Sequence, residues 1–267
     1  MYVPSKRNVL LLHGGPALSG YFGPLIPALE RDYQVTAYTQ TANSLPGLRL
    51  ELESYIRECI LRDGESPIVV GHSFGGVLAL LYAASMAKKP KYLPRKIILL
   101  DSAPLDLGSK AAFRANLAAR ITPDVRAKLD ALDVAFDATE DEAERTRLQH
   151  RNLALITPFY NADRSSTARL SEPTWDYDSF AAISDEFLEM IEAGVIPELL
   201  SQIQTPVVSF HGAADPIPVE RVLPFLRANL PFFRANTYVG AGHFLWVEPR
   251  GIGERFIDDL RAELARP

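Results

Sequence analysis

The sequence predicts an α/β protein whose mostly parallel sheet is covered by helices on both faces, with a helical segment inserted into it. Short runs that are apolar throughout alternate with helical segments over residues 8–101, and the alternation resumes at residue 205. About a hundred residues separate the two regions, far more than an ordinary connection within a sheet. A chain of 267 residues, 47% of them hydrophobic, can bury a core of that size.

The pattern of the first region predicts strands and helices in strict alternation. In chain order we expect a strand in 8–15, a helix at 23–32 with prolines in its first turn, a strand at 33–39, an amphipathic helix at 46–64, a strand at 67–71, a helix from about Ser73 to Met86 and a strand at 95–101. Ligands of such sheets bind at the carboxyl ends of the strands. His13 and Ser73 both lie at such ends.

The second region continues the sheet after a helical insertion. We expect a strand at 205–212, a helix near 218–228, a strand at 235–240 and a last helix from about Glu248 to Leu264. Within the insertion, caps, charge patterns and apolar spacing predict helices at 122–136, 139–156 and 183–200. The expected organisation is a core of residues 1–103 and 204–267, interrupted by a helical cap at 104–203.

Composition limits the possible partners and compartment. Twenty-eight basic and 33 acidic residues give a net charge of −5 with mixed signs, so we expect neither nucleic acid nor an anionic membrane as partner. Cys59 is the single cysteine and excludes an intrachain disulfide. The N-terminal apolar run is too short for a secretory signal, which favours the cytoplasm. Residues 68–87 carry no Asp, Glu, Lys or Arg, but His72, Ser73 and the glycines favour a buried strand, turn and helix over a membrane span.

The segment VVGHSFGGVLAL, residues 69–80, places a serine where a strand gives way to a helix. Such an abrupt change strains the intervening turn and pushes its side chain out over the sheet. Small residues two positions before and after the serine allow neighbouring backbone to approach the turn closely. Gly71 and Gly75 occupy these positions around Ser73. The pattern G-H-S-F-G, with a strand before it and a helix after it, predicts a nucleophile elbow.

A serine hydroxyl needs a base to take its proton, and the base needs an acid to orient it. His243 follows the strand at 235–240, and Asp215 follows the strand at 205–212. The other four histidines lie beside turns, in the insertion or at a strand end, so we expect His243 to be the base. Asp215 is the expected acid because it lies in a flexible turn; Asp101, at the end of an earlier strand, is the alternative.

The developing oxyanion needs backbone N–H donors fixed in advance. Phe74, directly after the serine, is the expected first donor. The loop HGGPA at residues 13–17 is expected to supply the second from Gly15, because Pro16 has no N–H and glycine lets the backbone approach the substrate closely.

Taken together, these motifs resemble the α/β-hydrolase family, in which the same order Ser73, Asp215, His243 occurs and a helical cap interrupts the core. The resemblance implies that Ser73 attacks an acyl carbon, His243 shuttles the proton, and no metal or organic cofactor takes part. The HGGP loop is similar to the proline iminopeptidase branch, whereas GHSFGG is similar to general esterases, lactonases and C–C bond hydrolases.

We therefore expect a serine hydrolase that cleaves a small or medium acyl substrate, an ester or a lactone. The first alternative is an N-terminal aminopeptidase, for which Glu172, Asp176 and Asp178 could face the amine of the substrate. A ligand receptor and a cofactor-free lyase or cyclase are further alternatives, because the fold does not fix the function. Candidate pocket residues beside the catalytic loops and in the cap are Phe22, Trp175, Asp176, Phe244 and Trp246; ordinary core packing is the alternative for the aromatic ones.

Overall fold

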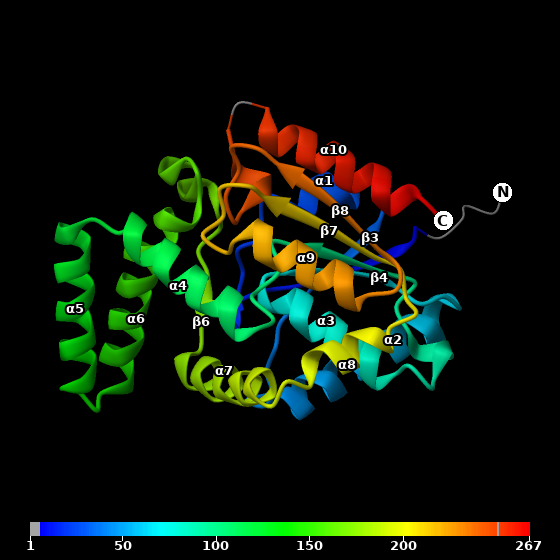
Figure 1. Cartoon of the computed structure of the whole chain (residues 1–267), viewed down its shortest axis with the longest axis horizontal. Helices are drawn as coiled ribbons and strands as arrows, with labels where there is room; N and C mark the ends of the chain where they lie inside the picture. The colour runs from blue at the N-terminus through cyan, green and yellow to red at the C-terminus, as the bar shows by residue number, and fades with distance from the viewer. Residues whose placement is uncertain (1–5, 250) are drawn as a thin grey trace.

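A computed structural model describes residues 6–249 and 251–267 of the chain (Figure 1). Residues 1–5, which belong to the N-terminal stretch discussed above, lie outside the described residues. The described residues form a sheet of six parallel strands, in the order β3 (Gln34–Tyr38), β1 (Asn8–Leu12), β4 (Ile68–His72), β5 (Lys96–Leu100), β7 (Val207–Gly212) and β8 (Phe233–Tyr238). The predicted α/β fold class is confirmed.

Helices cover both faces of this sheet. Helices α1 (Ile26–Glu30) and α10 (Ile252–Ala265) lie on one face, and α2 (Leu45–Asp63), α3 (Phe74–Ser85), α8 (Ile196–Ser201) and α9 (Val219–Asn229) lie on the other (Figure 1). Alternate strand residues enter the two cores: Leu10 packs with α2 and α3, whereas Leu11 packs with α1 and α10. Central strands must therefore be apolar on both sides, which explains their continuous hydrophobic runs.

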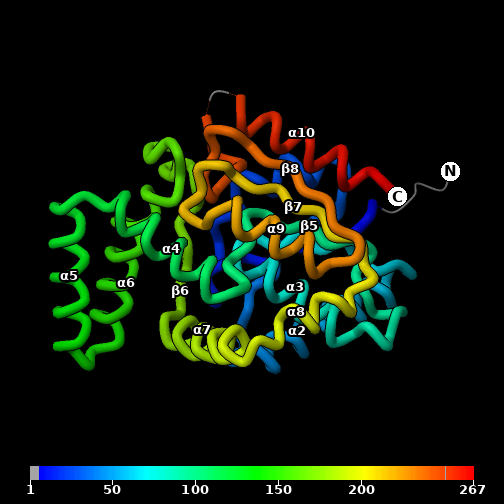
Figure 2. Tube along the Cα trace, viewed as in Figure 1, coloured from blue at the N-terminus to red at the C-terminus, as the bar shows by residue number. Residues whose placement is uncertain are grey.

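Between β5 and β7 the chain forms a largely helical segment, from α4 (Leu107–Arg120) to α8. Its remaining elements are α5 (Pro123–Asp137), α6 (Glu142–Ile156), η2 (Thr157–Tyr160), η3 (Arg164–Arg169), β6 (Thr174–Trp175) and α7 (Tyr177–Glu192). Helices α5 and α6 lie side by side at one end of the molecule (Figure 2). The short strand β2 (Leu18–Ser19) pairs antiparallel with β6, so this segment is tied to the loop after β1.

Several element boundaries differ from the sequence-based expectation. The single helix expected at 183–200 is two helices, α7 and α8, because Gly194 between them adopts a left-handed φ of 67°. The last helix begins at Ile252 rather than near Glu248, after Pro249 and the left-handed Gly251. Helix α4 was not predicted, although Asp106 caps it by accepting a hydrogen bond from Ser109 N at 2.8 Å.

Among the described residues, no helix combines the length and the apolar character that crossing a membrane requires.

Candidate active site

Ser73 lies between β4 and α3 in a turn that only glycine neighbours allow. Its φ of 53° and ψ of −119° are rare for a residue with a side chain. A Cβ added at Gly71 would lie 2.4 Å from the carbonyl oxygen of Gly75, and one added at Gly75 would lie 2.2 Å from that of Leu12. The two glycines therefore let three backbone segments meet beneath the serine.

His243 and Asp215 meet at the same edge of the sheet. His243 Nδ1 lies 2.7 Å from Asp215 Oδ2, and both residues are buried. The other oxygen of Asp215 accepts a hydrogen bond from Ile217 N at 2.8 Å, which fixes the carboxylate in its loop after β7. An imidazole that donates from Nδ1 keeps the lone pair on Nε2 free to accept a proton.

The loop that carries His243 is fastened to the helical segment between β5 and β7. His243 N donates to Tyr160 O at 3.0 Å, and Phe244 N donates to Asn161 Oδ1 at 2.8 Å. Glu248 Oε1 accepts from Gly242 N at 2.7 Å and from Ala162 N at 3.0 Å. The position of His243 thus depends on residues more than eighty positions away in the chain, and no local sequence pattern marks them.

A directed hydrogen-bond chain links the loop after β1 to the His243 loop. Since a carbonyl only accepts, His72 Nε2 must donate to His243 O, at 3.0 Å. His72 Nδ1 then accepts from the hydroxyl of Tyr21, at 2.8 Å, and the same hydroxyl accepts from Gly14 N. Burial lowers the pKa of His72 well below its ordinary value, which keeps the ring neutral as this chain requires. The sequence placed His72 beside a turn and excluded it as the base, but it gave no sign of the role of Tyr21.

The loop after β1 lies directly against the serine. A Cβ added at Gly14 would lie 2.6 Å from Cβ of Ser73. The N–H of Gly14 is bound by Tyr21, whereas no described acceptor binds that of Gly15, where φ is 32°. Phe74 is the first residue of α3, where a backbone N–H has no partner within the helix. Neither of the two predicted oxyanion donors therefore has an acceptor among the described residues.

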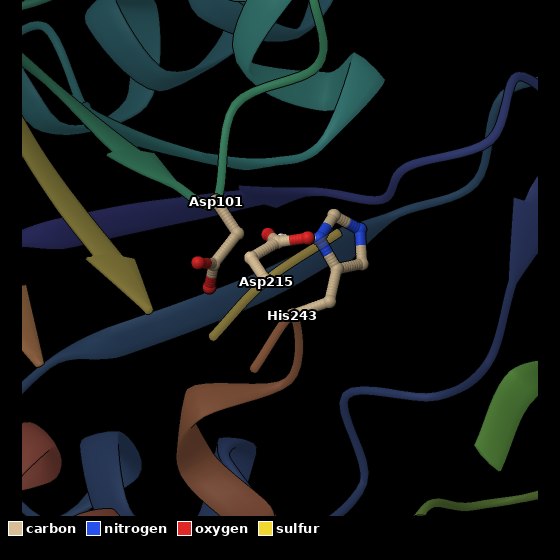
Figure 3. A group of neighbouring side chains, drawn as sticks. All are labelled: Asp101, Asp215 and His243. Carbon is tan, nitrogen blue, oxygen red and sulfur yellow. Dashed lines mark hydrogen bonds and ion pairs between the residues drawn. The ribbon is translucent and has the colours of Figure 1, made fainter. Parts of the chain in front are cut away.

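Asp101 lies beside Asp215 and on its far side from His243 (Figure 3). It is fully buried at the end of β5 with a φ of 46°, and its Oδ1 accepts a hydrogen bond from Gly212 N at 2.7 Å. An oxygen of each aspartate and a ring nitrogen of His243 lie within 4.8 Å of one another. Such a trio could ligate a metal ion, but here Nδ1 of His243 faces Asp215 at hydrogen-bond distance.

A cavity of about 410 Å³ lies between the loop after β1 and the segment from α6 to η3; Phe244, next to His243 in the chain, lines it, whereas Ser73, Asp215 and His243 do not. Leu18, Tyr21 and Phe244 line its inner side, and Leu153 and Leu170 are among the residues of its outer wall. His150, Arg164 and Glu172 supply polar groups. The lining is mostly apolar, as in pockets that bind small organic molecules.

The candidate pocket residues fall into different places. Phe244 lines the cavity, whereas Phe22 and Trp246 are buried against each other, with ring centroids 5.6 Å apart, in the core beside α1 and α10. Trp175 lines a second cavity of about 100 Å³ between α5 and α6. Asp176 is the N-cap of α7 and accepts from Ser179 N at 3.1 Å.

Comparison with known proteins extends this picture. The family model described as "Alpha/beta hydrolase family" matches residues 9–255. The chain belongs to this family. The expectation of a hydrolase is thereby confirmed, at the level of the family.

Individual relatives are distant. The chain is 24% identical over 244 residues to the pimeloyl-[acyl-carrier protein] methyl ester esterase of Edwardsiella ictaluri (strain 93-146), covering 89% of this chain and 86% of that one. The crystal structure of VinJ superposes with a TM-score of 0.63 at 21% identity, covering 97% of this chain and 90% of VinJ. Proline iminopeptidase of Mycobacterium smegmatis gives a TM-score of 0.58 at 17% identity, covering 97% and 89%. At these identities the solved structures establish the fold alone.

Proposed function

We propose that this hydrolase cleaves carboxylic esters through an acyl-enzyme formed on Ser73. The single observation that carries the proposal is the 2.7 Å contact between His243 and Asp215, at the sheet edge where Ser73 is held in a strained turn. His243 Nε2 takes the hydroxyl proton as Ser73 Oγ attacks the acyl carbon, and Asp215 stabilises the imidazolium that forms. The proton then passes to the leaving alkoxide, and water, activated by the same histidine, releases the acid.

The proposed oxyanion hole consists of the backbone N–H groups of Gly15 and Phe74. The strained turn and the loop beside it hold these donors in place before substrate arrives, so no reorganisation is needed as charge develops on the acyl oxygen. Preorganised donors of this kind contribute roughly 10²–10³ in rate each.

The proposed substrate is an ester or lactone with a small or medium apolar acyl group. The mostly apolar surface of the 410 Å³ cavity supports this, as does the similarity to an enzyme whose name describes it as a methyl ester esterase. In this proposal residues 104–203 act as a cap, because α6, η2 and η3 form one wall of the cavity.

One observation favours a second candidate, an N-terminal aminopeptidase of the proline iminopeptidase type. Of the three acidic residues that could bind a substrate amine, Glu172 lines the cavity. Asp176 is engaged in capping α7 and Asp178 is exposed in the first turn of that helix. Arg164 lines the same cavity and offsets the charge of Glu172, which disfavours a cationic substrate.

Turnover of p-nitrophenyl esters of increasing acyl length, measured beside alanyl and prolyl p-nitroanilides, tests both candidates. We expect ester cleavage to dominate and Ser73→Ala to lower kcat by about 10⁴-fold or more. Ser201→Ala, at the exposed end of α8, is the matched control and should leave kcat unchanged. Preferred cleavage of the anilides would replace the esterase proposal by the aminopeptidase. Stoichiometric ligand binding without any turnover would contradict both.

A further inference from the structure

We propose that Asp101 is a positioning residue: as a neutral carboxylic acid it donates a hydrogen bond to the Asp215 carboxylate and holds that carboxylate against His243. The proposal rests on the proposed function, because it assigns Asp101 a place behind the acid–base pair of that mechanism. It replaces the alternative in which Asp101 itself orients the base.

The backbone fixes the side chain of Asp101 in this place. Strand β5 pairs with β7, and Asp101 N donates to Phe210 O at 2.9 Å just beyond the last paired residues. The left-handed φ of 46° then turns the side chain toward the loop after β7, where its Oδ1 accepts from Gly212 N. One of its carboxyl oxygens lies within 4.8 Å of an oxygen of Asp215, and the two side chains lie next to each other (Figure 3).

Asp101 has fewer hydrogen-bond donors around it than a buried carboxylate anion needs. The side chain is 0% exposed, and its Oδ2 receives a hydrogen bond from no donor in the described part of the chain. A buried carboxylate oxygen without a donor is costly, whereas a protonated oxygen becomes a donor itself. Asp215, at the other end of the contact, is the acceptor that such a donor needs.

The charges around the pair place the single proton on Asp101 rather than on Asp215. The titratable groups that face Asp101 are Asp215, Glu248 after the short helix η4 (Leu245–Val247), Tyr238 on β8 and the ring of His243. No lysine or arginine of the described residues forms an ion pair with it. Burial and the neighbouring Asp215 charge raise the pKa of Asp101 well above its ordinary value.

Asp215, in contrast, has the surroundings of an anion. Ile217 N donates to one oxygen and His243 Nδ1 to the other. Arg120 lies near enough for its charge to attract Asp215, and its guanidinium binds Ala214 O at 2.7 Å. Two carboxyl groups in contact in a dry site cannot both ionise, so the more strongly stabilised anion keeps the charge.

The protonation state can be measured directly by carbon NMR on protein labelled with ¹³C at the aspartate side-chain carboxyl. At neutral pH we expect one aspartate signal at the position of a protonated acid, and we expect Asp101→Asn to remove that signal. A set of aspartate signals that are all ionised at neutral pH would overturn the proposal. The readout requires no activity, so it stands even if the esterase proposal fails.

The contribution to positioning is measured by comparing three variants on whichever ester the wild type cleaves. In Asp101→Asn the amide oxygen can accept from Gly212 N while the NH₂ donates to Asp215, and asparagine tolerates a positive φ. We expect this variant to retain kcat/KM within about threefold, whereas Asp101→Ala should lower kcat about 10- to 100-fold with little change in KM. Asp215→Asn should lower kcat by about 10⁴-fold.

The proposal is overturned if Asp101→Asn is inactive while Asp215→Asn remains active, since Asp101 would then be the ionised acid that orients the base. It is also overturned if Asp101→Ala folds and has the activity of the wild type. If Asp101→Ala does not fold, the comparison of wild type with Asp101→Asn decides. Absence of ester turnover in the wild type would contradict the proposed function alone.

Discussion

At the level of single residues, the glycines around Ser73 do not have equal roles. A Cβ at Gly75 would lie 2.2 Å from the carbonyl oxygen of Leu12 in β1, whereas one at Gly76 would lie 3.1 Å from the side chain of Leu99 and 3.3 Å from the carbonyl oxygen of Gly71. The first overlap is too large for the backbone to relieve, but the contacts at Gly76 require shifts of only a few tenths of an ångström.

We therefore expect Gly75→Ala to lower the free energy of unfolding by about 3 kcal/mol or to prevent folding, and Gly76→Ala to change it by about 1 kcal/mol or less. Urea unfolding of the two variants provides the measurement. Equal losses of stability would show that close contact with the backbone of β1 is not what requires glycine at position 75.

The hydroxyl of Tyr21 binds two partners near the site, Gly14 N and His72 Nδ1. Tyr21→Phe keeps the buried ring but leaves Gly14 N and His72 Nδ1 without their partner. We expect a loss of about 1–3 kcal/mol in unfolding free energy, and a lower kcat because the loop after β1 loses its anchor. Tyr33→Phe is the control, since the hydroxyl of Tyr33 makes only a 3.5 Å contact to Arg261 O. Equal effects of both substitutions would contradict this role of Tyr21.

At the level of elements, the segment between β5 and β7 holds the His243 loop as well as lining the cavity. Asn161→Ala would remove the acceptor of Phe244 N and the donor to Ser166 Oγ. We expect kcat to fall about 10-fold, with a stability loss of about 1–3 kcal/mol. Asn229→Ala, which removes one bond to Phe225 O in α9, should leave kcat unchanged. An unchanged kcat in Asn161→Ala would mean that this segment does not position the base.

The elements that the sequence predicted well are those whose cause is local. Buried parallel strands need continuous apolar runs, and the elbow at Ser73 needs small residues at fixed spacing, so both are visible in a short window of sequence. The break between α7 and α8 was missed because glycine inside a helical pattern is often tolerated. Helix α4 was missed although Asp106 and Ser109 have the spacing of an N-terminal cap.

The supports of the site were less visible than the site itself. The sequence predicted that Asp215 and His243 would meet, because both follow parallel strands whose ends share one edge of the sheet. Tyr21, Asn161 and Glu248 act through contacts with residues distant in the chain, and their types and spacing carry no signal of it. Only the folded chain brings these donors and acceptors together.

For the molecule as a whole, buried neutral histidines make stability depend on pH. Burial lowers the pKa of His13 to about 4, and it also lowers the pKa of His72 and His211. Below the ordinary histidine pKa of about 6.5, the unfolded chain binds protons that the folded chain does not. The contribution of these neutral histidines to the free energy of unfolding is therefore complete above about pH 6.5 and is lost as the pH falls toward 4.

We expect the free energy of unfolding to fall between pH 7.5 and 5.5, with His13 alone contributing about 1 kcal/mol, measured by urea unfolding. Nitrogen NMR of the imidazole rings assigns the effect, because the His13 ring should still be neutral at pH 5.5. A charged His13 ring at that pH in the folded protein would contradict the burial described here.

The most direct measurement on the proposed mechanism is reaction of the native protein with a fluorophosphonate, followed by mass spectrometry of its peptides. One equivalent should modify Ser73 and abolish ester turnover, and His243→Ala should slow the modification by orders of magnitude because the serine then lacks its base. Modification at another residue, or a rate that does not depend on His243, would contradict the assignment of Ser73 as the activated nucleophile.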